Sequence, residues 1–181
     1  SAADRWLHCP PSARLSELYE DKGSDYAAEG TDAHTLCEYK LLRALGREAE
    51  DPTENLSWFD EEMADCADGY AAYVMEQVAE AKERCADPVV LIEQRVDFSR
   101  WVEEGFGTAD CIILADGTLQ ICDYKHGRGV EVSAEENPQM MCYALGALEI
   151  FDDIYDIDTV RMTIYQPRRS NISTYEISKD D

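Results

Sequence analysis

Two aspartates and a lysine stand in a mostly apolar stretch of this chain. Residues 107–110 read GTAD and residues 123–125 read DYK, and both lie in runs typical of buried strands. Side chains alternate between the two faces of a strand, so Asp123 and Lys125 share one face while Tyr124 points to the other. Buried charges are costly unless they are paired or bind a metal. These residues therefore indicate a chemical role.

A third carboxylate, Glu93, lies in the preceding strand-like segment VVLIEQRV. If these strands neighbour one another in register, Glu93, Asp110 and Asp123 cluster near Lys125. Three close carboxylates repel one another, and a hard cation with oxygen ligands, Mg²⁺ or Mn²⁺, removes that repulsion. Such a cation activates a bound water and neutralises charge on a phosphodiester, and a lysine can orient the attacking water. The residues indicate metal-dependent hydrolysis and leave the number of ions open.

The elements that must position these residues follow from periodicity and capping. The sequence predicts helices over 2–9, 12–21, 25–46, 57–86 and 134–151, with Gly30 interrupting the third and Ser133 capping the last, and strands over 88–99, 105–116, 117–127, 159–167 and 171–178. The pair Asp116-Gly117 between two apolar runs predicts a hairpin. We expect an α/β/α sandwich around a mixed sheet of about four to five strands, with an N-terminal helical part.

The length of 181 residues and a hydrophobic content of 45% suit one domain. We expect this domain over 1–181, with helices over 1–87 and the sheet core over 88–181. The chain begins without methionine and ends directly after a strand-like run, which leaves open that it is a piece of a longer protein.

The net charge of −23 argues against nucleic acid as a partner, because phosphates would be repelled. Most of the excess acid lies in the first 87 residues, on helix faces, so it need not line the groove that holds the motifs. We interpret His126, Arg128, Arg168 and Arg169 as surface side chains, with phosphate contacts by the three arginines as an open alternative.

Seven cysteines without a C-x-x-C pair indicate reduced thiols in a cytoplasmic protein, with Cys9 interpreted as a buried thiol. No stretch has the length of a membrane span, and we expect no membrane partner.

Taken together, the motifs resemble the PD-(D/E)XK nuclease superfamily, in its RecB-like and lambda-exonuclease-like branch. GTAD, followed by DYK with Asp123 thirteen residues after Asp110, is similar to that superfamily's second and third motifs. Gln139-Met-Met-Cys-Tyr143 resembles its Gln-x-x-x-Tyr helix, EGTDAH its upstream histidine, and RWLHCPPS its N-terminal segment. The resemblance spans nearly the whole chain in the same order and is closest to a phage-associated RecB-like group.

The resemblance implies a restriction-endonuclease-like α/β/α core and a set of metal ligands. Asp110 and Asp123 would hold Mg²⁺ or Mn²⁺, with His34 and the backbone carbonyl of Tyr124 as further ligands. Glu93 would be a ligand or a structural acid.

Roles in catalysis follow from the same resemblance. Lys125 would be catalytic, and Gln139 and Tyr143, which an i, i+4 spacing puts on one helix face, would position Lys125 or the DNA end. Some relatives bind an iron–sulfur cluster through one early and three late cysteines. Cys9 matches the early position but the late triplet is absent, so no iron–sulfur cluster is expected within this chain.

The implied function is that of a Mg/Mn-dependent deoxyribonuclease, expected to be an exonuclease. It would hydrolyse DNA through metal-activated water during phage or mobile-element DNA processing, with a recombination or phage protein as a further partner. Two alternatives remain. One is a catalytically inactive nuclease-fold module that binds a protein partner through its acidic surface, and the other is a metal-dependent hydrolase with a different substrate.

Overall fold

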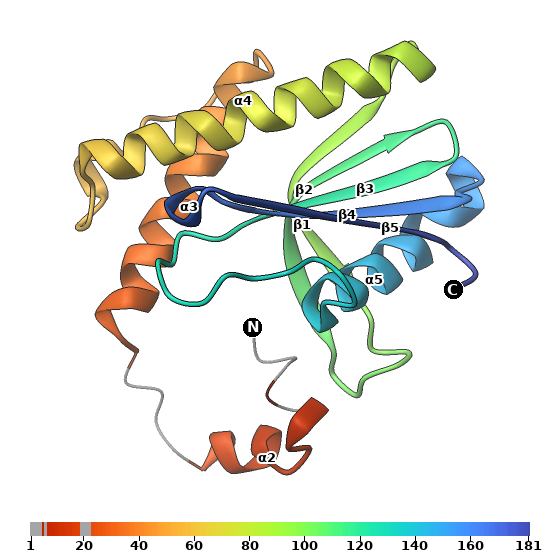
Figure 1. The fold of residues 1–181 in the computed structure, drawn as a ribbon, viewed down its shortest axis with the longest axis horizontal. Coiled ribbons are helices and arrows are strands. Elements are labelled where there is room, and N and C mark those ends of the chain that lie inside the picture. Colours follow the sequence, from red (N-terminus) through yellow and green to blue (C-terminus); the bar gives the residue numbers. More distant parts are fainter. Residues whose placement is uncertain (1–4, 6, 19–22) are drawn as a thin grey trace.

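The computed structural model describes residues 5, 7–18 and 23–181, apart from the side chains at positions 13 and 17. Its elements are α2 (Ser12–Glu17), α3 (Asp25–Ala44), η1 (Thr53–Asn55), α4 (Glu61–Arg84), β1 (Val89–Asp97), β2 (Phe106–Ala115), β3 (Thr118–Tyr124), α5 (Pro138–Tyr155), β4 (Thr159–Gln166), η2 (Pro167–Arg169) and β5 (Asn171–Ser178). The expected helix over 2–9 and the end of the one over 12–21 fall partly outside the described residues. Figure 1 shows the arrangement.

The five strands form one sheet in the order β1-β2-β3-β4-β5. Neighbours are antiparallel except β3 and β4, which are parallel and joined through α5. Asp116 and Gly117 form the β2–β3 turn, both with positive φ (36° and 75°), which is what a two-residue type I′ hairpin requires. The predicted hairpin is therefore confirmed.

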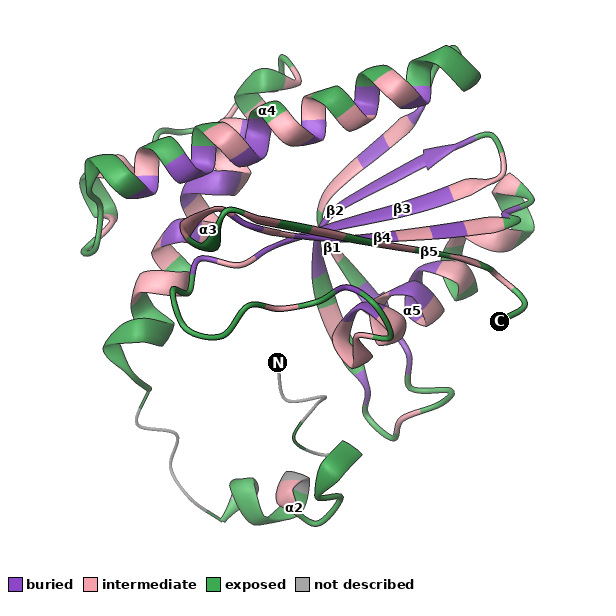
Figure 2. Ribbon diagram, in the orientation of Figure 1, coloured by how far each residue is buried: buried purple, intermediate pink, exposed green. Residues whose placement is uncertain are grey.

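Helices cover both faces of the sheet. One core cluster joins α3 and α4 to residues of β1, β2 and β3, and a second joins α5 to the opposite face. Figure 1 shows α3 and α4 on one side of the strands and α5 on the other, and Figure 2 shows the buried residues concentrated along the central strands. The expected α/β/α architecture with a mixed sheet is confirmed. Within the part of the chain that the structure describes, no helix has the length and apolar character to cross a membrane.

The helix starts differ in detail from the sequence predictions. Ser24 caps α3 by accepting the N–H of Ala27 at 3.2 Å, and Gly30 lies inside this helix without interrupting it. A single interior glycine costs only about 1 kcal/mol, which the buried face of α3 offsets. The last helix begins at Pro138, not near residue 134, because Asn137 is its cap: the Asn137 side chain accepts the N–H groups of Gln139 and Met140.

Candidate metal centre

Strands β2 and β3 part where the two aspartates lie. Their ladder ends with Cys111 opposite Cys122, and the same register would place Asp110 opposite Asp123. Instead of a ladder bond at this position, Oδ2 of Asp110 accepts the backbone N–H of Tyr124 at 2.6 Å. The side chain of Asp110 thus fills the gap between the parting strands, and both carboxylates gather at this opening.

Strand β1 is distorted at the same level. Glu93 has φ of 49° and lies opposite Asp110 without pairing, although Ile92 and Gln94 on either side pair normally with Cys111 and Ala109. A left-handed non-glycine residue costs about 1–3 kcal/mol, and such strain is found most often at functional sites.

The distortion changes which way the side chains face. Cys111 packs in the α3/α4 core, whereas Ala109, two residues earlier, packs in the α5 core, so the simple alternation is broken at Asp110. As a result Asp110 reaches α3, where Nδ1 of His34 lies 3.1 Å from its Oδ1. Strict alternation would have put Asp110 on the α5 side with Ile112.

Three side chains converge here. One ligand atom from each of His34, Glu93 and Asp110 lies within 4.8 Å of the others. Burial, followed by the charge of Asp110, raises the pKa of Glu93 to about 7. Burial lowers the pKa of His34, but its hydrogen bond to Asp110 and the charges of Asp110 and Asp123 outweigh this and raise it above 6.5. The charge of Asp110 contributes to both shifts, and a cation bound among these groups would offset that negative charge.

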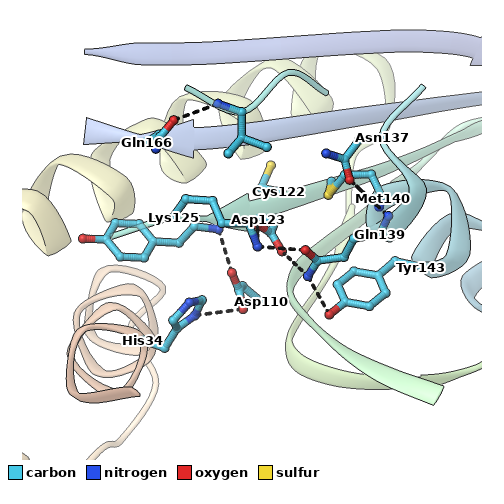
Figure 3. Close-up of polar contacts among 12 residues, drawn as sticks. His34, Asp110, Cys122, Asp123, Lys125, Asn137, Gln139, Met140, Tyr143 and Gln166 are labelled. Carbon is cyan, nitrogen blue, oxygen red and sulfur yellow. Dashed lines mark hydrogen bonds and ion pairs between the residues drawn. The ribbon is translucent and has the colours of Figure 1, made fainter. Parts of the chain in front are cut away.

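A second group of side chains adjoins the first (Figure 3). Asp123 is 2% exposed, and its Oδ2 lies 2.7 Å from Nζ of Lys125. Nζ also donates to Oε1 of Gln139 at 2.9 Å, while Nε2 of Gln139 contacts Oδ1 of Asp123 at 3.2 Å and the hydroxyl of Tyr143 at 2.9 Å. One amide from α5 therefore contacts both the carboxylate and the ammonium group. A role for Gln139 and Tyr143 in positioning Lys125 or the DNA end stays a prediction.

The carboxylate of Asp123 retains capacity for a ligand. Burial raises the pKa of Asp123 despite the opposing charge of Lys125. Its buried Oδ2 is paired with Nζ of Lys125 at 2.7 Å and has no further partner among the described residues. A buried carboxylate whose Oδ2 has one partner, beside two further carboxylates and an imidazole, fits Mg²⁺ or Mn²⁺, which take oxygen ligands and tolerate a nitrogen.

The structure places the predicted residues in two adjoining groups, not in one. His34, Glu93 and Asp110 form the first group, and Asp123, Lys125, Gln139 and Tyr143 form the second. Tyr124 contributes its N–H to Asp110, and its ring is buried on the α3/α4 side, as the alternation predicted. The Tyr124 carbonyl as a metal ligand stays a prediction.

Three side chains were interpreted wrongly from the sequence. His126 is 4% exposed, not a surface residue, and its Nδ1 lies 2.7 Å from the hydroxyl of Tyr124. The side chain of Arg168 is only 9% exposed. Cys9, interpreted as buried, is exposed, and all seven cysteines, each within the described residues, are free thiols. These environments depend on contacts between distant segments, which local patterns do not reveal.

No local pattern pointed to Gln166, which holds the loop between Lys125 and Gln139. This buried amide accepts the N–H of Val132 at 3.1 Å and donates to the carbonyls of Gly127 and Val130 at 3.0 and 3.1 Å. The loop therefore has a fixed path between the two residues that contact Asp123.

The acid Glu93 leads to a prediction for the metal-free protein. Its folded pKa of about 7 is above the usual 4.5, so its stabilising contribution is complete below pH 4.5 and is lost as pH rises through 7. We expect Glu93→Gln to raise stability at pH 8 by about 1 kcal/mol, a value discounted because solvent screens this group. Thermal unfolding at pH 5 and pH 8 measures the effect. Glu103→Gln, on the hairpin loop after β1, is the control, and equal pH dependence of wild type and Glu93→Gln would contradict the prediction.

Gly107 leads to a second prediction, because a Cβ there would overlap the ring of Tyr143. Gly107→Ala must displace this ring from Gln139, and we expect a loss of about 1–3 kcal/mol of stability. Gly129→Ala is the matched control, since a Cβ at Gly129 has open space around it. Chemical denaturation of both variants tests this, and equal stabilities would show that the contact is unimportant.

The family described as "Protein of unknown function (DUF2800)" matches residues 1–181, the whole chain. The protein belongs to the DUF2800 family. A solved structure named "Crystal structure of SSO0001" is similar to this DUF2800 protein at 15% sequence identity, over 80% of this chain and 76% of that chain, with a TM-score of 0.28. Similarity at that level carries no argument about the site. The chemistry of this DUF2800 protein is therefore inferred from its own residues.

Proposed function

We propose that this DUF2800 protein is a Mg²⁺- or Mn²⁺-dependent deoxyribonuclease of the PD-(D/E)XK type. The convergence of His34, Glu93 and Asp110 within 4.8 Å, beside the Asp123–Lys125 pair, carries the proposal. His34, Glu93 and Asp110 come from three separate elements, and Glu93 itself is the strained residue in β1. A surface ion pair would need neither three converging elements nor a strained backbone residue.

Different residues would bind the cation, orient the attacking water and position the lysine. His34, Glu93, Asp110 and Asp123 would hold the cation, which when bound supplies Lewis-acid stabilisation of the phosphodiester and a more acidic water. Lys125 is paired with Asp123, and Gln139 fixes the direction of its ammonium group. That ammonium group orients the attacking water and stabilises the negative charge that develops on the phosphate. Tyr143 holds the amide of Gln139 in place.

The substrate class is argued from the same chemistry. A cation site with an adjacent fixed ammonium suits a phosphodiester, whose transition state carries negative charge on several oxygens. We infer DNA as the substrate and exonucleolytic cleavage, in phage or mobile-element DNA processing, from the resemblance of the GTAD, DYK and Gln-x-x-x-Tyr segments. The free thiols fit a cytoplasmic setting.

The proposal is tested by incubating the protein with supercoiled plasmid, with linear duplex and with single-stranded DNA, in Mg²⁺, in Mn²⁺ and in EDTA. We expect metal-dependent loss of linear DNA from its ends and protection by EDTA. Persistence of all three substrates in both metals, with a folded protein, would refute nuclease activity.

One observation favours a second candidate. The net charge of −23 is high for a protein that binds DNA, and it suits a module that binds a basic protein partner. Such a module needs no cation. Calorimetric titration with Mn²⁺ separates the two candidates. If Mn²⁺ does not bind, or binds equally well after Asp110 is replaced, the result favours the module.

A further inference from the structure

Two arginines from separate segments meet on one carboxylate beside the metal centre. Arg128 lies in the loop after β3 and Arg168 in η2, and Nη2 of each contacts Oε2 of Glu62 in the first turn of α4, at 3.0 Å for Arg168. Arg168 also donates to Oε1 of Glu29 on α3 at 2.6 Å. Hydrogen bonds from Arg168 and Arg128 lower the pKa of Glu62.

This cluster flanks the candidate metal centre. Nη1 of Arg168 lies 3.5 Å from the carbonyl of His126, the residue after Lys125, and Arg128 is three residues beyond Lys125. Glu29 belongs to the helix that carries His34. Backbone contacts and a shared helix therefore connect the arginine pair to both groups of the site.

The geometry is that of an anion site with one buried arginine, Arg168, and one exposed arginine, Arg128. The Arg168 side chain is only 9% exposed, and its Nε is buried without a hydrogen-bond partner among the described residues. Arg128 is 64% exposed on a loop flanked by glycines, and Glu62 is 43% exposed. Ion pairs at such exposed positions contribute little free energy, so the Glu62 carboxylate can be displaced.

We propose that Arg128 and Arg168 form a binding site for a phosphate of the nucleic-acid backbone, in which the Glu62 carboxylate takes the place of the phosphate until DNA binds. Guanidinium groups form charge-assisted hydrogen bonds with carboxylate and with phosphate oxygens, so a phosphate can take the place of the carboxylate between the two arginines. The proposal rests on the proposed nuclease function. It also gives a strongly acidic chain a local cationic surface for DNA. The two guanidinium groups become available to a phosphate only when the Glu62 carboxylate leaves them.

The experiment measures DNA binding by fluorescence anisotropy, using a short end-labelled duplex and Asp123→Asn as the common background to prevent cleavage. Glu62→Gln is compared with Glu61→Gln, which makes the same charge change in the same helical turn. We expect Glu62→Gln to tighten binding about fivefold and Glu61→Gln by less than about twofold. Arg128→Gln should weaken binding and make the dependence of log K on log salt shallower by about 0.9. Thermal unfolding of each variant checks the fold.

The double variant Glu62→Gln/Arg128→Gln decides whether the two residues act together. We expect the gain from Glu62→Gln to vanish in it, because the gain requires the released arginine. Equal gains for Glu61→Gln and Glu62→Gln, or a gain that persists without Arg128, would overturn the inference. The nuclease proposal is judged separately by cleavage in the wild type: cleavage without a Glu62 effect refutes only the phosphate site, and a Glu62 effect without cleavage refutes only the nuclease.

Discussion

Replacement of Lys125 by methionine is expected to lower the rate of DNA cleavage by about 10³-fold, because it removes the fixed cation beside the reacting phosphate. Lys125 is 24% exposed, and its ammonium group contacts Asp123 and Gln139. Methionine keeps most of the side-chain length and packing, so the fold should persist. Initial rates on linear duplex DNA at saturating Mg²⁺ measure the effect.

Lys40→Met is the matched control for this variant. Lys40 also forms an ion pair, with Asp68 at 2.8 Å, but on α3 and away from the metal ligands. It should retain at least about half of wild-type activity, since such surface pairs contribute little. Comparable losses in the two variants, or unchanged cleavage in Lys125→Met, would remove Lys125 from the mechanism.

Asp110→Asn is expected to weaken Mn²⁺ binding by about 100-fold or more, because a neutral amide replaces a carboxylate at the centre of the ligand group. The asparagine oxygen can still accept the N–H of Tyr124, the contact that Asp110 makes where β2 and β3 part. We therefore expect the metal-free variant to remain folded and cleavage to be lost. Isothermal titration with Mn²⁺ gives the affinity, and circular dichroism gives the fold.

Asp68→Asn provides the comparison for the Asp110 variant. Asp68 is 60% exposed and pairs only with a surface lysine in the described structure, so its loss removes one negative charge without touching the ligand group. Similar Mn²⁺ affinities for the two variants would mean that Asp110 is not a ligand and that binding follows overall charge.

The strands and most contacts in the group of Asp123, Lys125, Gln139 and Tyr143 were predictable, because they follow from patterns within short stretches of sequence. Asp116-Gly117 determines a tight turn, and that turn sets the register that brings Asp110 level with Asp123. Strand alternation predicts that Asp123 and Lys125 share a face, and the i, i+4 spacing predicts that Gln139 and Tyr143 do. Each of these inferences uses residues that are neighbours in the sequence.

The first group could not be derived from local patterns alone. Register and alternation suggested that Glu93 could approach Asp110, but not that Glu93 adopts a left-handed conformation or that Asp110 turns toward α3. The partners of Arg168 come from α3 and α4, more than a hundred positions earlier in the chain. Such contacts depend on how helices pack on the sheet, which sequence periodicity does not specify.

The site takes its side chains from both helical layers: His34 comes from α3 on one face of the sheet, and Gln139 and Tyr143 come from α5 on the other. Neither layer alone carries a complete reaction centre. For the proposed nuclease, a molecule with only one helical layer packed on the sheet would therefore lack part of the centre, and damage to the DNA of the cell that makes it would require both layers to be in place.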